Sequence, residues 1–135
     1  SIAIRMRGDI RPFPDLLKAE KSCQLQTRTS PWIADYPDGD NFMQLYYGPN
    51  TGQNNNGCVK IPAYDELYRA SQKLADGPER DLIYHKMTRI MELYSAQRLG
   101  YARYRNMVAQ PRVIGYKKHP ILSAEWMYFD IEKNK

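Results

Sequence analysis

The central third of the sequence contains two segments, each opened by a proline, whose apolar side chains recur at helical spacing. Pro78 begins the longer helix, which we expect to continue to Gly100. Pro62 begins the shorter helix. Because each helix has one apolar face, both must bury that face in a shared core. The stripe of the longer helix, spaced i, i+4, i+7, i+8 and i+11, consists of Ile83, Met87, Ile90, Met91 and Tyr94.

The first thirty residues predict two short strands separated by a helix. Apolar and polar side chains alternate over residues 2–6 and again over residues 24–29, which is the period of a half-buried strand. Pro14 favours a helix that runs to about Lys21. Pro31 ends the second strand, because proline cannot donate a hydrogen bond to a neighbouring strand.

A further helix is predicted between these strands and the central pair. Asp38 or Asp40 can cap its start, and apolar residues follow directly. Gly48 followed by Pro49 is a strong signal for its end. This part of the chain therefore adds a short third helix to the predicted core.

The C-terminal third favours extended structure. We expect residues 101–108 to be extended, Val113 and Ile114 to precede a turn, and the aromatic residues 126–131 to form a last short strand. Strands and helices alternate early and helices cluster in the middle, which predicts an α/β fold with few short strands and several helices. Three or four short strands are too few for a complete doubly wound sheet. We therefore expect residues 1–135 to be a single fragment of something larger.

The composition is that of an ordinary globular protein, with 42% hydrophobic and 26% charged residues. No run approaches the roughly 18 apolar residues of a membrane span, and no signal peptide is recognisable. The net charge of +5 is spread along the chain and favours anionic surroundings weakly. Cys23 and Cys58 could form a disulfide in an oxidising compartment, but in the absence of a C-x-x-C motif we expect two free thiols.

No combination of residues predicts catalysis, a metal site or a cofactor. His85 and His119 have no second histidine, cysteine or carboxylate at ligand spacing. Neither a nucleophile elbow nor a glycine-rich phosphate loop is present. The acidic cluster of Asp35, Asp38 and Asp40 does not match an EF-hand. We therefore expect no enzymatic activity, no catalytic residue, no metal ligand and no cofactor.

Aromatic and basic residues interleave over residues 101–105, a composition typical of platforms for single-stranded nucleic acid. On a strand, however, Tyr101, Arg103 and Arg105 share one face, whereas Tyr104 lies on the other. The residues do not form one stacking surface, so we expect no nucleic-acid partner.

Trp32, Asp35 and Tyr36 place two aromatic rings and a carboxylate within five residues, at the exit of the second predicted strand. Ligands bind at strand ends in α/β folds. A carboxylate accepts charge-assisted hydrogen bonds from an ammonium, and flanking rings exclude water and strengthen that attraction. These three residues are the candidate binding site, for a small cationic or zwitterionic ligand. The alternative is that the two aromatic residues belong to the core and that Asp35 is a helix cap.

Three longer motifs cover most of the chain: WIADYPDGDNFMQLYYGPN, YDELYRASQKLADGPERDLIYHKMTRIMELY and QPRVIGYKKHP. Together they resemble the C-terminal part of the family 5 extracellular solute-binding proteins, which serve ABC importers of oligopeptides, dipeptides, nickel chelates and related solutes. The resemblance runs from about Ile2 to Ile131. It implies a type II periplasmic-binding-protein fold, whose two lobes close over the solute, with this chain as the C-terminal portion of one lobe.

The resemblance also implies roles for the candidate site. In peptide-binding members of the family, a carboxylate at the position of Asp35 holds the α-amino group of the ligand. In nickel-type members, aromatic residues at the positions of Trp32 and Tyr36 contact the ligand. The implied function is binding of an oligopeptide or dipeptide for uptake by an ABC transporter, in the periplasm or another extracytoplasmic compartment. The implied partners are the solute, the membrane permease subunits and the missing N-terminal lobe.

A second interpretation is a standalone module that binds a macromolecule through its 11 tyrosines, since tyrosine combines a flat apolar face with a hydroxyl. A hydrolase finds no support, because no pair of nucleophile and base can be assembled. A natural gene product several hundred residues longer, preceded by a signal peptide, would favour the importer interpretation over the module.

Overall fold

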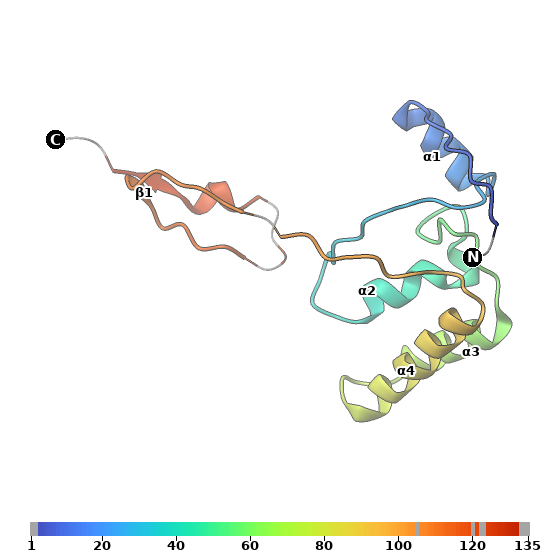
Figure 1. The fold of residues 1–135 in the computed structure, drawn as a ribbon. Coiled ribbons are helices and arrows are strands. Elements are labelled where there is room, and N and C mark those ends of the chain that lie inside the picture. The colour runs from blue at the N-terminus through green and yellow to red at the C-terminus, as the bar shows by residue number, and fades with distance from the viewer. Residues whose placement is uncertain (1–2, 105, 120, 122–123, 133–135) are drawn as a thin grey trace.

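The α-helices of the chain gather in one body, and a short hairpin lies apart from them (Figure 1). The computed structural model describes residues 3–104, 106–119, 121 and 124–132. An extended segment leads from the end of α4 toward the hairpin. In chain order the elements are α1 (Phe13–Lys21), α2 (Asp40–Met43), the 3-10 helices η1 (Gln44–Tyr46) and η2 (Gly48–Asn50), α3 (Pro62–Ser71), α4 (Pro78–Leu93), β1 (Val113–Ile114), the 3-10 helix η3 (Glu125–Tyr128) and β2 (Asp130–Ile131).

The core lies between α3 and α4, as the paired apolar stripes predict. Tyr64 and Met87 are fully buried, and Ile61 and Met91 complete the buried cluster. The Tyr64 hydroxyl donates a 2.8 Å hydrogen bond to the backbone oxygen of Met43, which ties α2 to α3. Burial raises the pKa of Tyr64, so its hydroxyl remains a donor at neutral pH. This buried hydroxyl therefore has the partner that a polar group in a core requires.

The predicted stripe of α4 is confirmed up to Met91 and is wrong at Tyr94, which is 67% exposed. The helix ends at Leu93 rather than at Gly100 because a Schellman motif closes it. The N–H of Ala96 donates to the oxygen of Met91 and the N–H of Ser95 to that of Glu92. Ser95 adopts a left-handed conformation, with φ of 49°. The chain therefore turns away before Tyr94 can reach the core.

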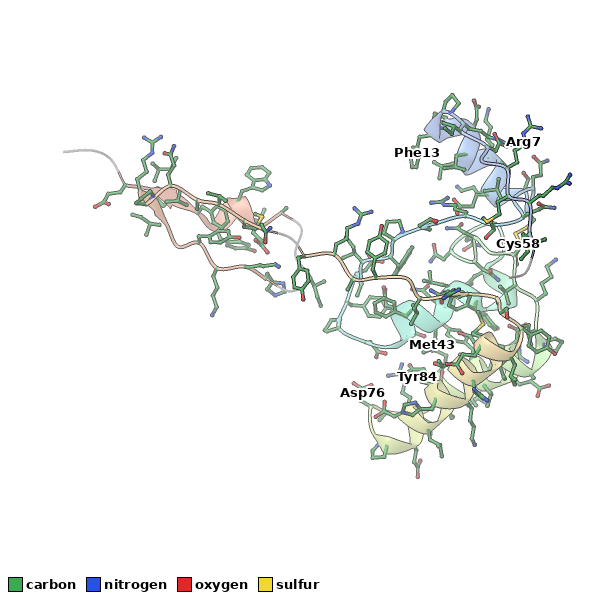
Figure 2. All side chains as sticks on the ribbon, viewed as in Figure 1. Arg7, Phe13, Met43, Cys58, Asp76 and Tyr84 are labelled. Atoms are coloured by element: carbon green, nitrogen blue, oxygen red, sulfur yellow. A yellow bond between two sulfur atoms is a disulfide. The ribbon has the colours of Figure 1, made fainter. Side chains whose placement is uncertain are left out.

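A disulfide between Cys23 and Cys58 fastens α1 to the loop that precedes α3 (Figure 2). The predicted pair of free thiols is therefore wrong. Cys23 lies in a left-handed conformation directly after α1, where the N–H of Gln24 donates to the oxygen of Ala19 and that of Cys23 to Glu20. A cross-link that closes a loop of this length stabilises a protein by about 3–4 kcal/mol in the chain-entropy account.

Asn55 shapes the loop that presents Cys58. Its side chain is fully buried and donates hydrogen bonds to the backbone oxygens of Val59, at 2.8 Å, and Tyr47, at 3.1 Å. Its own carbonyl oxygen accepts from the N–H of Val59 at 3.1 Å. These bonds replace the ladder or helix partners that the loop backbone lacks.

The sheet is smaller than the alternating patterns predict. β1 and β2 pair antiparallel, with Val113 opposite Ile131. The strands predicted at residues 2–6 and 24–29 are wrong, because the described part of those segments has no regular structure; Ile2 lies outside it. Alternation produces a strand only where a neighbouring strand covers its apolar face. Here the face is open, and Met6 is 83% exposed.

Two further expectations are met in part. A 3-10 helix occupies the first residues of the predicted strand 126–131, so only its last two residues belong to β2. The predicted short helix after Asp38 is present as α2 and η1. The described residues thus form a small mixed domain of helices and one short sheet, which is loosely compatible with the α/β class. None of its helices, within the described ranges, is long and apolar enough to cross a membrane.

Met87 offers the sharpest test of the core. We expect Met87→Ala to lower the free energy of unfolding by about 2–5 kcal/mol, because it empties a fully buried volume. Met87→Asp should have a larger effect, because it buries a charge without a partner. Urea denaturation followed by circular dichroism measures both. Leu82→Asp, at an exposed position of the same helix, is the matched control and should change little. An unchanged midpoint for both Met87 variants would contradict the placement of the core.

Candidate functional site

Asn41, at the start of α2, fixes the backbone and one ring of the candidate site. Its side-chain oxygen accepts a 2.7 Å hydrogen bond from the indole Nε1 of Trp32 and a 3.2 Å bond from the backbone N–H of Asp35. Asn41 is fully buried, so these bonds are shielded from competing water. One amide oxygen thus holds both ends of a four-residue segment.

The Asp38 carboxylate connects the site to α4. Its oxygens accept hydrogen bonds from the N–H of Asp40, at 2.7 Å, and from the Arg80 guanidinium, at 2.8 Å. The predicted capping by Asp38 or Asp40 is wrong, because the N-cap position of α2 is Gly39, without a side-chain cap hydrogen bond, and Asp40 is the first residue of the helix itself. The Asp40 N–H, and then Arg80, hold the pKa of Asp38 below its ordinary value. Asp38 therefore stays ionised and keeps its cation in place.

Arg80 is buried within this polar cluster. Besides Asp38, it donates to Asp76 at the turn that precedes α4 (Figure 2). Its guanidinium lies 5.2 Å from the ring centroid of Tyr84. The bond to Asp38 raises the pKa of Arg80, so the group remains a cation under all physiological conditions. Burial raises the pKa of Tyr84 to about 12, which keeps the phenol neutral beside the ion pair.

Asp40 connects the site to the end of α3, as Asp38 connects it to α4. It accepts a 2.8 Å hydrogen bond from the Tyr36 hydroxyl and a 2.6 Å bond from the Gln72 side-chain amide. Desolvation, followed by the bond to Asp40, raises the pKa of Tyr36. Asp38 and Asp40 thus connect this part of the chain to α4 and to the C-terminal end of α3.

The three predicted site residues do not meet in one place. Asp35 and Tyr36 line an open groove of ≈580 Å³, together with His119 of the C-terminal segment. The half-buried Trp32 does not line it, because its indole is committed to Asn41. Tyr36 is 39% exposed and lines the groove, while its hydroxyl donates to Asp40. The remaining lining residues are Ile33, Ala34, Pro37 and Ile121.

Asp35 differs from the other carboxylates of the segment. Its side chain is exposed and has no hydrogen-bond or ion-pair partner among the residues that the structure describes. Its backbone N–H is nevertheless held by Asn41. The groove therefore contains a carboxylate whose backbone is held and which is available to a cationic group. The alternative role of Asp35 as a helix cap is wrong, because the N-cap position of α2 is Gly39.

Sequence reasoning missed the residues that support the site. Asn41 sits between Asp40 and Phe42, and no local pattern distinguishes it from a surface amide. Arg80 lies in a charged first helical turn, where the usual interpretation is a solvated face. His119 was expected at the surface without a role, yet it lines the groove, and its backbone N–H donates a 2.7 Å bond to Glu125. The resemblance places Asp35 in the ligand site but does not name these supports.

Comparison with known proteins leaves the site without a precedent: no family model, no curated protein and no solved structure matches this chain. Over the ranges that the structure describes, no three histidine, cysteine or acidic side chains are grouped as a metal site would require.

Removal of the Asn41 side chain should free residues 32–35 from the contacts that hold them in place. We expect Asn41→Ala to lower the free energy of unfolding by about 1–3 kcal/mol, because the indole N–H of Trp32 loses its buried acceptor. The emission of Trp32 should shift to longer wavelength as its ring becomes solvated. Both proteins should carry Trp126→Phe, which removes the exposed second indole. Asn54→Ala, at an exposed amide, is the control. An unchanged emission maximum would show that Asn41 does not hold the segment.

The pair of Asp38 and Arg80 predicts a defined dependence of stability on pH. Because the pKa of Asp38 is depressed in the folded state, its contribution is present above its ordinary value of 3.8 and is lost as the pH falls through the lower folded-state pKa. Arg80→Met should therefore be less stable than the wild type by about 1–3 kcal/mol at pH 7. That difference should shrink below pH 3.8. Urea titrations at both pH values measure it, and a difference independent of pH would contradict the pairing.

Proposed function

We propose that the chain is part of a solute-binding protein of an ABC importer and that it binds the amino end of an oligopeptide or dipeptide. In this proposal, residues 1–135 form the C-terminal portion of one lobe of a type II periplasmic binding protein. The three long motifs that resemble the family 5 solute-binding proteins support it. The mixed helix and sheet composition is compatible with it.

The observation that carries the proposal is the state of Asp35. The carboxylate is exposed in a groove and lacks a partner within the described part of the chain, while its backbone is fixed by a buried amide. The neighbouring acids are already used, Asp38 by Arg80 and Asp40 by Tyr36 and Gln72. Because the backbone at Asp35 is already held, only its side chain loses conformational freedom when it binds an ammonium. This arrangement favours recognition of a positively charged amino group.

Binding by this route needs a second surface over the groove. Ligands of this size normally have about 70–90% of their surface buried, and the groove along residues 33–37 is open. In the proposed protein, the N-terminal lobe supplies that surface and closes over the solute. The solute shifts the equilibrium toward the closed form only through contacts made there. The closed form is then recognised by the membrane permease subunits, in the periplasm or another extracytoplasmic compartment.

The interpretation as a tyrosine-rich interaction module retains one supporting observation. Several aromatic side chains beyond α4 are largely exposed, among them Tyr101, Tyr104 and Tyr128. Exposed apolar surface of this kind marks interaction sites. The two functions are separable by experiment, because this surface lies outside the groove that contains Asp35.

Asp35→Asn tests the proposed function in the natural polypeptide that carries both lobes. The substitution preserves shape and removes the charge, so a desolvated ammonium would lack its counter-charge. Removal of one partner of a buried charge pair costs about 2–5 kcal/mol, and affinity for a free-amine peptide should therefore fall roughly 30-fold or more. Isothermal titration calorimetry measures it. Asp15→Asn, at an exposed carboxylate of α1, is the matched control and should bind as the wild type does.

A modified peptide provides a second test of whether Asp35 binds the ammonium group. An N-acetylated peptide lacks the ammonium and should bind the wild type more weakly than the free-amine peptide does. For Asp35→Asn, the affinities for these two peptides should differ much less. Equal affinity of the wild type and Asp35→Asn for the free-amine peptide would show that Asp35 has no role in binding.

A further inference from the structure

The backbone between α4 and β1 has unused hydrogen-bonding capacity. Residues 97–104 and 106–109 make no hydrogen bond to other backbone groups, although both ends of the segment are anchored. At its start, Gln97 accepts a hydrogen bond from the hydroxyl of Tyr46. At its end, the oxygen of Gln110 accepts from the N–H of Val113. In Figure 1 the described parts of this segment are drawn as extended chain, without a helix or an arrow. Such a strand is a template for pairing with another chain.

The side chains of this segment are as exposed as its backbone. Tyr104 and Val108 are 98% and 97% exposed, and Leu99 and Tyr101 are scarcely more covered. On an extended chain, Leu99, Tyr101 and residue 107 lie on one face, while Tyr104 and Val108 lie on the other. Both faces thus carry apolar side chains, which is typical of a strand that is covered on both sides. The segment therefore has the composition of a strand in the middle of a sheet, but within the described part of the chain no neighbouring strand pairs with it.

The positive charge of the segment and of its neighbouring residues favours an acidic partner. Residues 93–124 contain six basic side chains and no acidic one. Two copies of this segment would repel each other as neighbouring strands, because like charges that face each other across a sheet destabilise it. An acidic strand would instead place opposite charges in register. The basic residues are Arg98, Arg103, Arg105, Arg112, Lys117 and Lys118.

The hairpin beyond the segment is also incomplete. β1 and β2 contain two residues each, and an isolated two-stranded hairpin is marginally stable in water. Exposed apolar residues of the hairpin include Ile114, Trp126 and Ile131. A partner sheet beside residues 97–109 would extend this small sheet as well as satisfy the unpaired segment.

We propose that residues 97–109 add as a β-strand to the edge of a sheet in another polypeptide segment, one that carries acidic side chains among apolar ones. Main-chain hydrogen bonds provide the affinity in this mode of recognition, and side chains on the two faces provide the selectivity. Nucleic acid would neutralise the charge, but it would leave the backbone N–H and C=O groups unpaired. The proposal does not depend on Asp35, whose groove is lined by residues 33–37 and by residues 119 and 121.

The test uses the 135-residue chain and a fluorescent peptide of alternating valine and glutamate. Anisotropy should report saturable binding that weakens as salt is added, because the facing charges are exposed. Amide hydrogen exchange should show new protection confined to residues 97–109. Arg103→Glu with Arg105→Glu should weaken binding about 10-fold and should favour a peptide of alternating valine and lysine. Unchanged helical circular dichroism verifies that this double variant is folded.

Backbone pairing is tested separately from charge. Successive N–H groups of a strand point to opposite edges, so Ala102→Pro and Arg103→Pro each remove a donor from a different edge. At least one of them should abolish binding, and a peptide N-methylated at alternate residues should not bind the wild type. Absence of binding by the valine–glutamate peptide would overturn the proposal. Undiminished binding by both proline variants, or tighter binding of single-stranded oligothymidylate than of the peptide, would overturn it too.

Discussion

The carbonyl oxygen of the Asn41 side chain supports the part of the molecule on which the functional argument depends. It accepts from the Trp32 indole and from the Asp35 backbone, and it does so from a fully buried position. A buried amide that makes such bonds is difficult to replace, because loss of the acceptor leaves a desolvated donor. The neighbouring Asp38 and Asp40 then fasten the same turn to α4 and α3. Among the described residues, the Asp35 carboxylate has no partner, whereas the carboxylates of Asp38 and Asp40 are both hydrogen-bonded. This contrast supports the proposal that Asp35 binds a ligand.

A small number of local hydrogen bonds and one disulfide also hold the N-terminal part of the chain. The Schellman motif at the end of α1 puts Cys23 in a left-handed conformation, and Asn55 shapes the loop on which Cys58 lies. The disulfide therefore joins two turns that are each defined by their own hydrogen bonds. Glu20, buried beside it, forms an ion pair with Arg28. These contacts attach α1 without a large apolar interface of its own.

Sequence reasoning succeeded where the signals were local. Prolines, glycines and apolar stripes predicted α1, α3 and α4, because each of these features acts within one or two helical turns. It failed where the outcome depends on distant groups. The alternation at residues 24–29 predicts a strand only if another strand lies beside it, and Cys23 pairs with a cysteine 35 positions away. Tyr94 continues the stripe of α4 in spacing, but the turn at Ser95 carries the chain away. In the candidate site, residue type predicts a role for Asp35 and Tyr36, which line one groove, whereas the burial of Asn41 could not be predicted because it is a property of the folded chain.

The account is tested most directly by a crystal structure of the natural protein with a free-amine tripeptide bound. The predicted result is a peptide ammonium within charge-assisted hydrogen-bond distance of the Asp35 carboxylate, about 2.7–2.9 Å. The ring of Tyr36 should lie beside it, and Trp32 should still donate to Asn41. A peptide held by another acidic residue, with the Asp35 carboxylate paired to a lysine or arginine of the protein, would contradict the account.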